Sequence, residues 1–329
     1  MSILSERITQ DILKKLSPKI RKNKAKTTVC PKFVFICGEQ IIDENGVVRN
    51  DEELTQSQNK RHHLITEFQK EHTRYEEKTF KSILCVISEK MYSNDEIVDT
   101  LTFEELLADL SDQIIIIVES PGTICELGAF TVKKEYINKL LIINNKAYEN
   151  NKSFINEGPI KKMIDIKEDK VIWTSYEFNE FKEDFFVKSY IKEVIKRDLE
   201  FQPNKTEKLD LKNLVYELFN IIEIFSPLNK KELLSIYKST KGLCDFEIKN
   251  RSIHKINAIS KVINIMEKMQ LVNINEDYIT PNTEYSCFNA LFNISRSEFN
   301  SIRSEYLALI YKKHRYRLQE CDEDDIRVN

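Results

Sequence analysis

The sequence lacks the patterns that mark a metal centre or a disulfide scaffold. Its seven cysteines are scattered, none forms a C-x-x-C pair, and none has a histidine nearby at metal-ligand spacing. Most of them lie in apolar segments, where a thiol is usually a small core residue. The cysteine pattern therefore argues against both a disulfide framework and a zinc site, and we expect no metal ligands.

Membrane and targeting signals are missing as well. No apolar run approaches the length of a membrane span, and the first residues, MSILSERITQDILKK, lack the apolar core of a signal peptide. We therefore expect a reduced, cytoplasmic protein with no membrane partner. The formal net charge is only -3, so any binding to nucleic acid must come from a local patch.

What is present indicates a globular chain of two domains. The 329 residues are 41% hydrophobic and 31% charged, which is typical of folded domains. Residues 1–28 predict a helix and a basic arm, because seven basic residues between positions 14 and 26 occur without an acidic one. Such a block is usually a solvated face or a flexible arm, and polyanion binding is the alternative.

Residues 29–201 predict an α/β domain with a doubly wound parallel sheet. Short apolar runs alternate with amphipathic segments, and in the run QIIIIV at 113–118 every residue after Gln113 is β-branched, as expected for a central strand covered on both faces. The predicted strands are residues 32–37, 82–88, 113–118, 139–144 and 170–174. The predicted helices are residues 61–71, 102–110 and 124–134, followed by one long helix over 178–200 that leaves this domain.

The C-terminal part predicts a different fold class. After a linker at 202–207, helices are expected at 209–225, 229–237 and 252–269, and two short strands at 271–274 and 278–280. Three helices and a hairpin form a winged helix-turn-helix pattern, which we place at 208–285. Residues 286–329 predict a helical tail with an acidic end.

The candidate ligand site follows the strongest strand. Ligands of open parallel sheets bind beyond the carboxyl ends of the strands, where Glu119, Ser120, Gly122 and Thr123 lie. Gly122 allows close backbone approach, and the first N–H groups of the next helix favour an anion. Glu126 follows within the first turn, either as a chemical group or as the last member of a Thr123-x-x-Glu126 capping box. No P-loop or G-x-G-x-x-G is present, which argues against a kinase-like or dehydrogenase site.

The same residues carry a resemblance. The runs QIIIIVESPGTICELGAF (113–130) and KSFINEGP (152–159) resemble the nucleoside deoxyribosyltransferase-like effectors encoded beside bacterial retron reverse transcriptases. FICG (35–38), RHHL (61–64) and LTFEELLA (101–108) match as well. The winged-helix pattern also fits that family, so the resemblance covers nearly the whole chain.

The resemblance implies cleavage of a glycosidic bond. The glutamate of E-L-G attacks the anomeric carbon in the transferase family, and here that residue is Glu126. A carboxylate suits an oxocarbenium-like transition state. The expected activity is that of a retron anti-phage toxin that cleaves the nicotinamide–ribose bond of NAD, with NAD as substrate and no other cofactor. The alternatives are a nucleoside or nucleotide deoxyribosyltransferase or hydrolase, and a nucleotide-sensing DNA-binding regulator.

Four further residues are candidates for substrate binding. Gly38 ends the first strand, and Glu104 is a second carboxylate that could otherwise form a salt bridge on an exposed helix. Arg61 could pair with phosphate or be a surface arginine. Asn156 could reach the ribose or serve only turn chemistry.

A second function is expected from the winged helix. Lys249, Arg251, His254 and Lys255 lie in a stretch without acidic residues and could contact phosphates from a recognition helix. Docking onto a protein is the alternative. The resemblance implies a partner that combines both, a retron reverse transcriptase with its RNA-linked DNA. Apolar positions on the helix at 178–200 and on the tail helices predict a homo-oligomer or a larger assembly with this partner.

Overall fold

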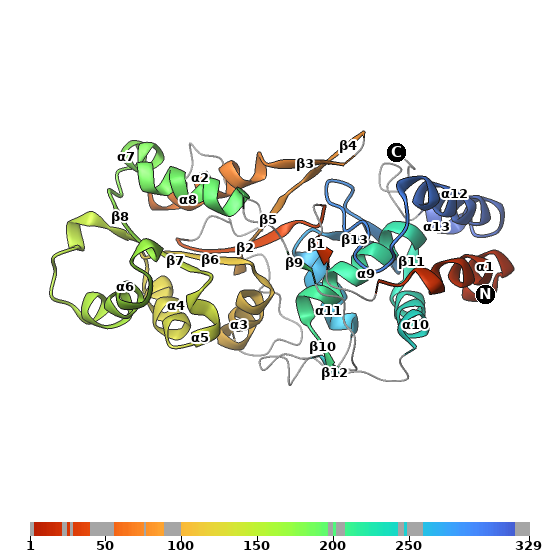
Figure 1. Cartoon of the computed structure of the whole chain (residues 1–329), viewed down its shortest axis with the longest axis horizontal. Coiled ribbons are helices and arrows are strands. Elements are labelled where there is room, and N and C mark those ends of the chain that lie inside the picture. The colour runs from red at the N-terminus through yellow and green to blue at the C-terminus, as the bar shows by residue number, and fades with distance from the viewer. Residues whose placement is uncertain are drawn as a thin grey trace. The chain divides into compact units, whose positions relative to one another are not determined.

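The computed structural model divides the chain into two compact units (Figure 1). The α/β unit comprises Lys32–His72 and Lys81–Arg197, and the helical unit comprises Met1–Pro31, Thr73–Phe80 and Asp198–Asn329. The structure describes residues 3–21, 25–26, 29–39, 56–75, 77–88, 100–196, 200–201, 208–242, 247–248 and 259–319.

The α/β unit contains the parallel sheet that the sequence predicts, and all five predicted strands are confirmed. They are β2 (Lys32–Cys37), β5 (Ile83–Val86), β6 (Gln113–Ile117), β7 (Leu140–Asn145) and β8 (Val171–Thr174), in the order β5-β2-β6-β7-β8. Every neighbouring pair is parallel. Along the chain, β2 is the first strand of this sheet. Strand β5 then pairs with one side of β2, and β6 pairs with the other side. This reversal makes the carboxyl ends of β2 and β6 the topological switch point, where such sheets bind ligands.

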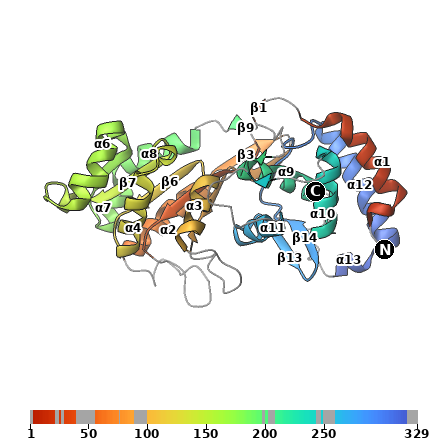
Figure 2. The same ribbon diagram turned by 90° about the horizontal axis from the view of Figure 1, so that it is seen from below.

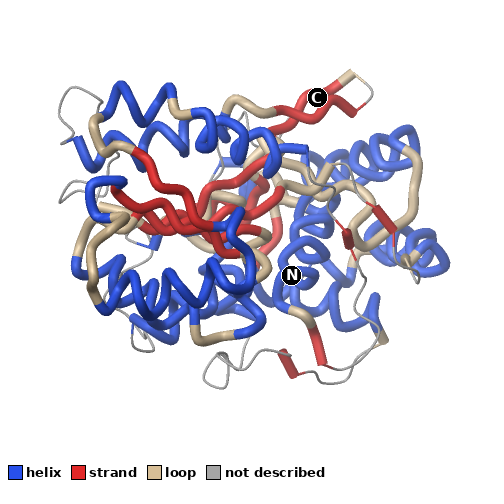
Figure 3. Tube along the Cα trace, turned by 60° about the vertical axis from the view of Figure 1, so that its left-hand side comes forward, coloured by secondary structure: helices blue, strands red, loops and turns tan. Residues whose placement is uncertain are grey.

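Helices cover both faces of this sheet (Figures 1 and 3). Alternate residues of β2 point to opposite faces. Val34 and Ile36 pack with α2 (Gln56–Gln69), α7 (Phe178–Glu183) and α8 (Phe185–Lys196). Phe35, on the other face, lies against Phe130 of α4, with ring centroids 6.2 Å apart. The remaining helices of the unit are α3 (Thr100–Leu110), α4 (Pro121–Thr131), α5 (Lys134–Ile137) and α6 (Lys161–Lys167).

The single long helix predicted over 178–200 is wrong. The segment forms α7 and α8, which are separated at Asp184. Asp184 has an extended backbone, and its Oδ1 accepts the N–H groups of Phe186 and Val187, so it caps α8. Helix α8 also stays with the sheet, because Tyr190 is buried and donates to Gln113 Oε1 at 2.7 Å.

The helical unit is built around α9 (Leu211–Phe225), in which nearly every side chain is buried. The predicted helices and hairpin are confirmed in the described residues as α9, α10 (Lys230–Lys241), α11 (Ile259–Lys268), β13 (Val272–Asn275) and β14 (Tyr278–Pro281). A short strand that the sequence did not indicate, β11 (Leu228–Asn229), joins them in a three-stranded antiparallel sheet of order β11-β14-β13. The first part of the predicted helix 252–269 lies outside the described residues.

The N-terminal helix belongs to this unit. Helix α1 (Arg7–Leu16) lies beside α12 (Arg296–Lys313), as Figure 2 shows. Lys15 pairs with Glu305 at 2.9 Å. The other elements are the hairpin β3 (His72–Tyr75) and β4 (Lys78–Lys81), which the sequence did not indicate, the pairs β1 (Ala25–Lys26) with β9 (Glu200–Phe201) and β10 (Lys208–Leu209) with β12 (Glu247–Ile248), and α13 (Tyr316–Gln319).

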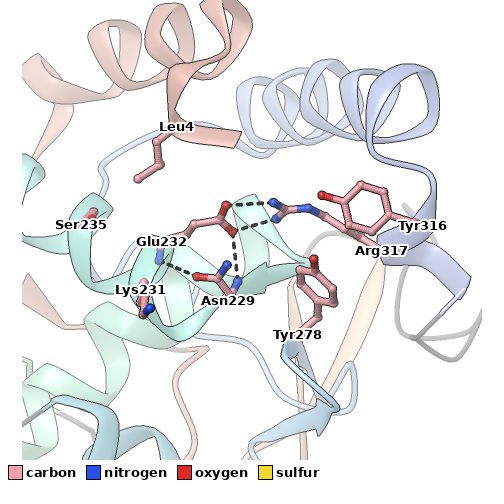
Figure 4. A pocket seen from close by; sticks show the side chains of 8 residues that line it. All are labelled: Leu4, Asn229, Lys231, Glu232, Ser235, Tyr278, Tyr316 and Arg317. Atoms are coloured by element: carbon pink, nitrogen blue, oxygen red, sulfur yellow. Dashed lines mark hydrogen bonds and ion pairs between the residues drawn. The ribbon is translucent and has the colours of Figure 1, made fainter. Parts of the chain in front are cut away.

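A buried ion pair fastens α13 to α10 (Figure 4). Arg317 Nη1 and Nη2 contact the two carboxylate oxygens of Glu232 at 2.7 and 2.9 Å. The same carboxylate accepts the backbone N–H groups of Ile3 and Asn229. Hydrogen bonds to Arg317 and Asn229 outweigh burial and lower the pKa of Glu232. Among the helices described, none is long and apolar enough to cross a membrane.

Candidate functional site

Four side chains from different elements meet at the switch point of the sheet. Cys37 is the last residue of β2, and the register of the parallel strands sets it opposite Ile116 of β6. Glu126 comes from α4, Glu104 from α3 and Arg61 from α2. The pKa of the Glu126 carboxyl is shifted by its neighbours Glu104, Arg61 and Cys37. The fold therefore brings two carboxyls, a thiol and a guanidinium to the edge where ligands bind.

The Glu126 carboxyl lies beside the Glu104 carboxyl and holds its proton more tightly than an ordinary glutamate. Burial raises the pKa of Glu126 to about 8, and the charge of Glu104 and a hydrogen bond to it act in the same direction. Arg61 and a hydrogen bond from Cys37 oppose this rise only in part. Glu104 is 8% exposed, so an exposed salt-bridging role is excluded. Such a pair can work as acid, base or nucleophile according to which carboxyl carries the proton.

Cys37 acts as a neutral hydrogen-bond donor in this arrangement. Its side chain is buried, and burial together with the neighbouring Glu126 raises its pKa well above the ordinary value. A thiol in that state is a poor nucleophile. The apolar segment around this cysteine predicted a core residue, and its position at the end of a predicted strand was the signal that could have placed it at the site.

Arg61 and Gly38 fit together at the end of β2. Arg61 is 1% exposed, so the surface-arginine alternative is wrong. Its Nε and Nη2 donate to the Ile36 carbonyl at 3.0 and 2.6 Å, and Nη1 donates to the Glu39 carbonyl at 3.2 Å. A Cβ on Gly38 would lie 2.9 Å from Arg61 Cδ. Gly38 is therefore required for this close approach, and Arg61 fixes the strand end on which Cys37 lies.

Helix α4 is capped without Glu126, so the predicted Thr123-x-x-Glu126 capping box is wrong. Ser120 is the N-cap, its side chain accepts the Thr123 N–H, and the Thr123 hydroxyl accepts the Ser120 N–H. Glu126 therefore lies in the second turn, where no cap requires its carboxyl. Pro121 has no N–H, which leaves Gly122 as the backbone donor of the first three helical residues for an anion.

Glu119 forms a buried ion pair that no local sequence pattern indicates. Lys60 Nζ lies 3.1 Å from Glu119 Oε2, with the two side chains 2% and 3% exposed. The Glu39 N–H donates to Glu119 Oε1, and Lys60 also lies 4.5 Å from the ring centroid of Tyr176. Burial raises the pKa of Glu119 to about 7 although Lys60 opposes it. Buried ion pairs are costly to form, which favours a role at a site.

A cavity of about 710 Å³ lies beside these residues, at the carboxyl ends of β6 and β7. The predicted ligands Glu119, Ser120 and Asn156 line it, whereas Gly122 and Thr123 do not. The described lining residues are Lys60, Val118, Glu119, Ser120, Pro121, Ile124, Asn144, Asn145, Tyr148, Asn151, Ser153, Ile155, Asn156 and Tyr176. Asn144 and Asn145, the last two residues of β7, were missed, although a position at a strand's carboxyl end was the same signal that singled out Glu119.

The predicted nucleic-acid contacts cannot be placed in the fold. Lys249, Arg251, His254 and Lys255 lie outside the described residues. The interface between them and a partner therefore stays a prediction.

Comparisons with known proteins agree with the likeness in the sequence. Residues 57–274 match the model of a family described as "STM3845 retron effector protein". A protein of Escherichia coli named "Retron Ec73 putative ribosyltransferase/DNA-binding protein" is 30% identical over an alignment of 244 positions, which covers 68% of this chain and 71% of that protein. A second, named "Retron Ec86 putative ribosyltransferase/DNA-binding protein", is 37% identical over 83 residues, about a quarter of each chain. The chain belongs to the STM3845 retron effector family.

Proposed function

We propose that the protein is a toxin effector of a retron anti-phage system and an N-glycosidase that cleaves the nicotinamide–ribose bond of NAD. The observation that carries the proposal is the Glu126 carboxyl beside Glu104 at the switch point between β2 and β6. Both Escherichia coli relatives have "ribosyltransferase" in their names, which is further support for chemistry at an anomeric carbon.

The proposed chemistry needs few groups. A carboxylate oxygen of Glu126 attacks C1′ while the bond from C1′ to the pyridinium nitrogen breaks, and the bonding electrons leave with neutral nicotinamide. Water then attacks C1′ and releases the Glu126 carboxylate. The proton that this water loses passes to Glu104 and from there to solvent. NAD and water thus give nicotinamide, ADP-ribose and one proton. The cationic pyridinium favours the charged form of Glu126 once the substrate is bound.

A transfer reaction is the second candidate. The same first step leaves ribose or deoxyribose on Glu126, and a second base in place of water would complete a transfer. The names of the relatives favour this candidate. Added acceptor bases distinguish the two reactions, because only a transferase makes a new nucleoside.

We further propose that the helical unit is a winged helix that binds a retron reverse transcriptase with its RNA-linked DNA in a larger assembly. The order α9, β11, α10, α11, β13, β14 with a three-stranded sheet supports this proposal. The names of both relatives include "DNA-binding". Binding through the four predicted contacts should weaken with salt, because phosphate contacts act through counterion release.

The activity is tested on the full-length protein, with and without the neighbouring reverse transcriptase. NAD and a panel of nucleosides and nucleotides are incubated with it, and mass spectrometry identifies the released bases. We expect nicotinamide and ADP-ribose from NAD. Release of a base from nucleosides alone would replace NAD by a nucleoside substrate. Binding without release from any member of the panel, in the presence of the partner, would favour a nucleotide-sensing regulator.

A further inference from the structure

The cavity beside β7 lies on a different flank of α4 from the carboxyl pair. Ile124 lines the cavity, and Glu126 is two residues further on, about 200° around the helix. Glu126 accordingly faces Glu104 of α3 and Cys37 of β2. The cavity and the carboxyl pair are therefore separate sites on the two sides of one helix.

Two asparagines that line this cavity have their side-chain oxygens bonded to backbone N–H groups. Asn144 Oδ1 accepts the backbone N–H of Asn145 at 2.8 Å, and Asn145 Oδ1 accepts the backbone N–H of Ala147 at 3.0 Å. These bonds fix which end of each amide is the oxygen. Because both oxygens are occupied by backbone, each side chain has its NH₂ group left to offer a ligand.

Asn156 presents the opposite polarity. Its Nδ2 donates to the carbonyls of Tyr148 and Asn151 at 2.7 and 2.8 Å, which holds the loop between them in place. The remaining Oδ1 is an acceptor, and no described residue bonds to it. The cavity wall thus combines two fixed donors and one fixed acceptor, all oriented by backbone contacts rather than by one another.

The charges and the side-chain types of the lining residues limit which class of ligand the cavity can bind. The charged residues among those described as lining the cavity are Lys60 and Glu119, and they neutralise each other in the buried ion pair. A phosphate would find no uncompensated cation there. Tyr148, Tyr176 and Ile155 add aromatic and apolar surface. A neutral, planar ring with both donor and acceptor groups fits this lining best.

We propose that this cavity binds the adenosine end of the dinucleotide, with adenine held by Asn144, Asn145 and Asn156. Adenine carries an amino donor beside a ring-nitrogen acceptor, a pair that one amide donor and one amide acceptor satisfy. The inference rests on the proposed function, because it assigns the nicotinamide end to Glu126 on the other flank. A volume of about 710 Å³ is within the range of small-molecule sites.

The test measures binding to the full-length Glu126→Gln protein, in which turnover is blocked. Isothermal titration calorimetry is carried out with adenosine and, separately, with nicotinamide mononucleotide. Asn145→Asp keeps the oxygen that accepts the Ala147 N–H but replaces the amino donor by an acceptor with a negative charge. Asn138→Asp, at an exposed position before β7, is the matched control.

We expect Asn145→Asp to weaken adenosine binding at least tenfold and to leave the affinity for nicotinamide mononucleotide unchanged. Asn138→Asp should change neither. Asn145→Ser, which keeps a capping oxygen and lacks the donor, should also weaken adenosine binding, and Trp173 fluorescence shows that each variant is folded. Unchanged adenosine binding in both Asn145 variants overturns the inference, and so does an equal loss for both probes.

The outcome is independent of the test of activity. Adenosine binding that is lost in the Asn145 variants supports this site even if the wild-type protein cleaves no NAD, in which case only the proposed activity fails. Conversely, NAD cleavage with a wild-type KM in Asn145→Asp would leave the activity standing and remove the adenosine site.

Discussion

Replacing Glu126 by glutamine should change how the stability of the α/β unit depends on pH. The buried carboxyl has a pKa of about 8 in the folded protein, against an ordinary value of 4.5. A raised pKa means that the stability contribution of the protonated group is full below pH 4.5 and is lost as the pH rises through 8. Glutamine has no proton to lose, so the variant should gain stability relative to the wild type over this interval.

The magnitude follows from the size of the rise in pKa. Each pKa unit corresponds to about 1.4 kcal/mol, which sets an upper limit of about 5 kcal/mol on the change in relative stability. Part of the rise in pKa comes from the neighbouring Glu104, and the Glu126 carboxyl is not fully buried. Both features reduce the effect, and we expect roughly 2 kcal/mol in favour of the variant between pH 5 and pH 8.5.

The assay uses the single tryptophan of the chain. Trp173 lies in β8, so its fluorescence during urea unfolding reports on the α/β unit. Wild type, Glu126→Gln and Glu180→Gln, a substitution at an exposed glutamate, are unfolded at both pH values. The stability of Glu126→Gln relative to the wild type should be greater at the higher pH. The stability of Glu180→Gln relative to the wild type should not depend on pH. Parallel behaviour of wild type and Glu126→Gln would refute the assignment of a buried, protonated Glu126.

Three further predictions concern neighbouring features. Gly38→Ala should destabilise the α/β unit by about 1–3 kcal/mol in the Trp173 assay, because the added Cβ would lie 2.9 Å from Cδ of the buried Arg61. Gly128→Ala, whose Cβ would meet nothing within 4 Å, should stabilise helix α4 by roughly 0.5–1 kcal/mol in the same assay. Glu104→Gln should shift the rise of activity with pH to lower pH in a rate profile, since the Glu104 charge contributes to the raised pKa of its neighbour. A profile that does not move would contradict this coupling.

The sequence predicted the architecture of the α/β unit because its signal is local. Short runs of mostly β-branched residues, such as residues 113–118, are typical of strands that are buried on both faces. Each strand carries this pattern within its own few residues, so it can be recognised without knowing the neighbouring strands. The break at Asp184 was also readable, because an aspartate before two phenylalanines can cap a new helix. The wrong capping box has a similar cause. Ser-Pro at 120–121 is a common helix start, and it places Glu126 one turn later than predicted.

The arrangement of the site depended on contacts between distant segments. The sequence left Glu104 open between a second carboxylate and an exposed salt-bridging residue, because the residues around it do not reveal that its carboxyl meets Glu126. Lys60 is adjacent in sequence to Arg61, which was a candidate, but its buried ion pair requires Glu119, which lies beyond the carboxyl end of β6. Long-range pairing of this kind is absent from local periodicity, whereas the rule that ligands bind beyond strand carboxyl ends pointed to the edge of the sheet where these side chains and the cavity lie.

The central claim is that the Glu126 carboxyl carries out the cleavage, and one rate comparison tests it most directly. Nicotinamide release from NAD is followed by mass spectrometry for wild type, Glu126→Gln and the control Glu180→Gln, each with the retron partner present. Without the carboxylate neither a covalent intermediate nor anionic support of an oxocarbenium can form, so Glu126→Gln should be at least about a thousandfold slower. Glu180→Gln should match the wild type. A folded Glu126→Gln protein that releases nicotinamide at the wild-type rate would contradict the account.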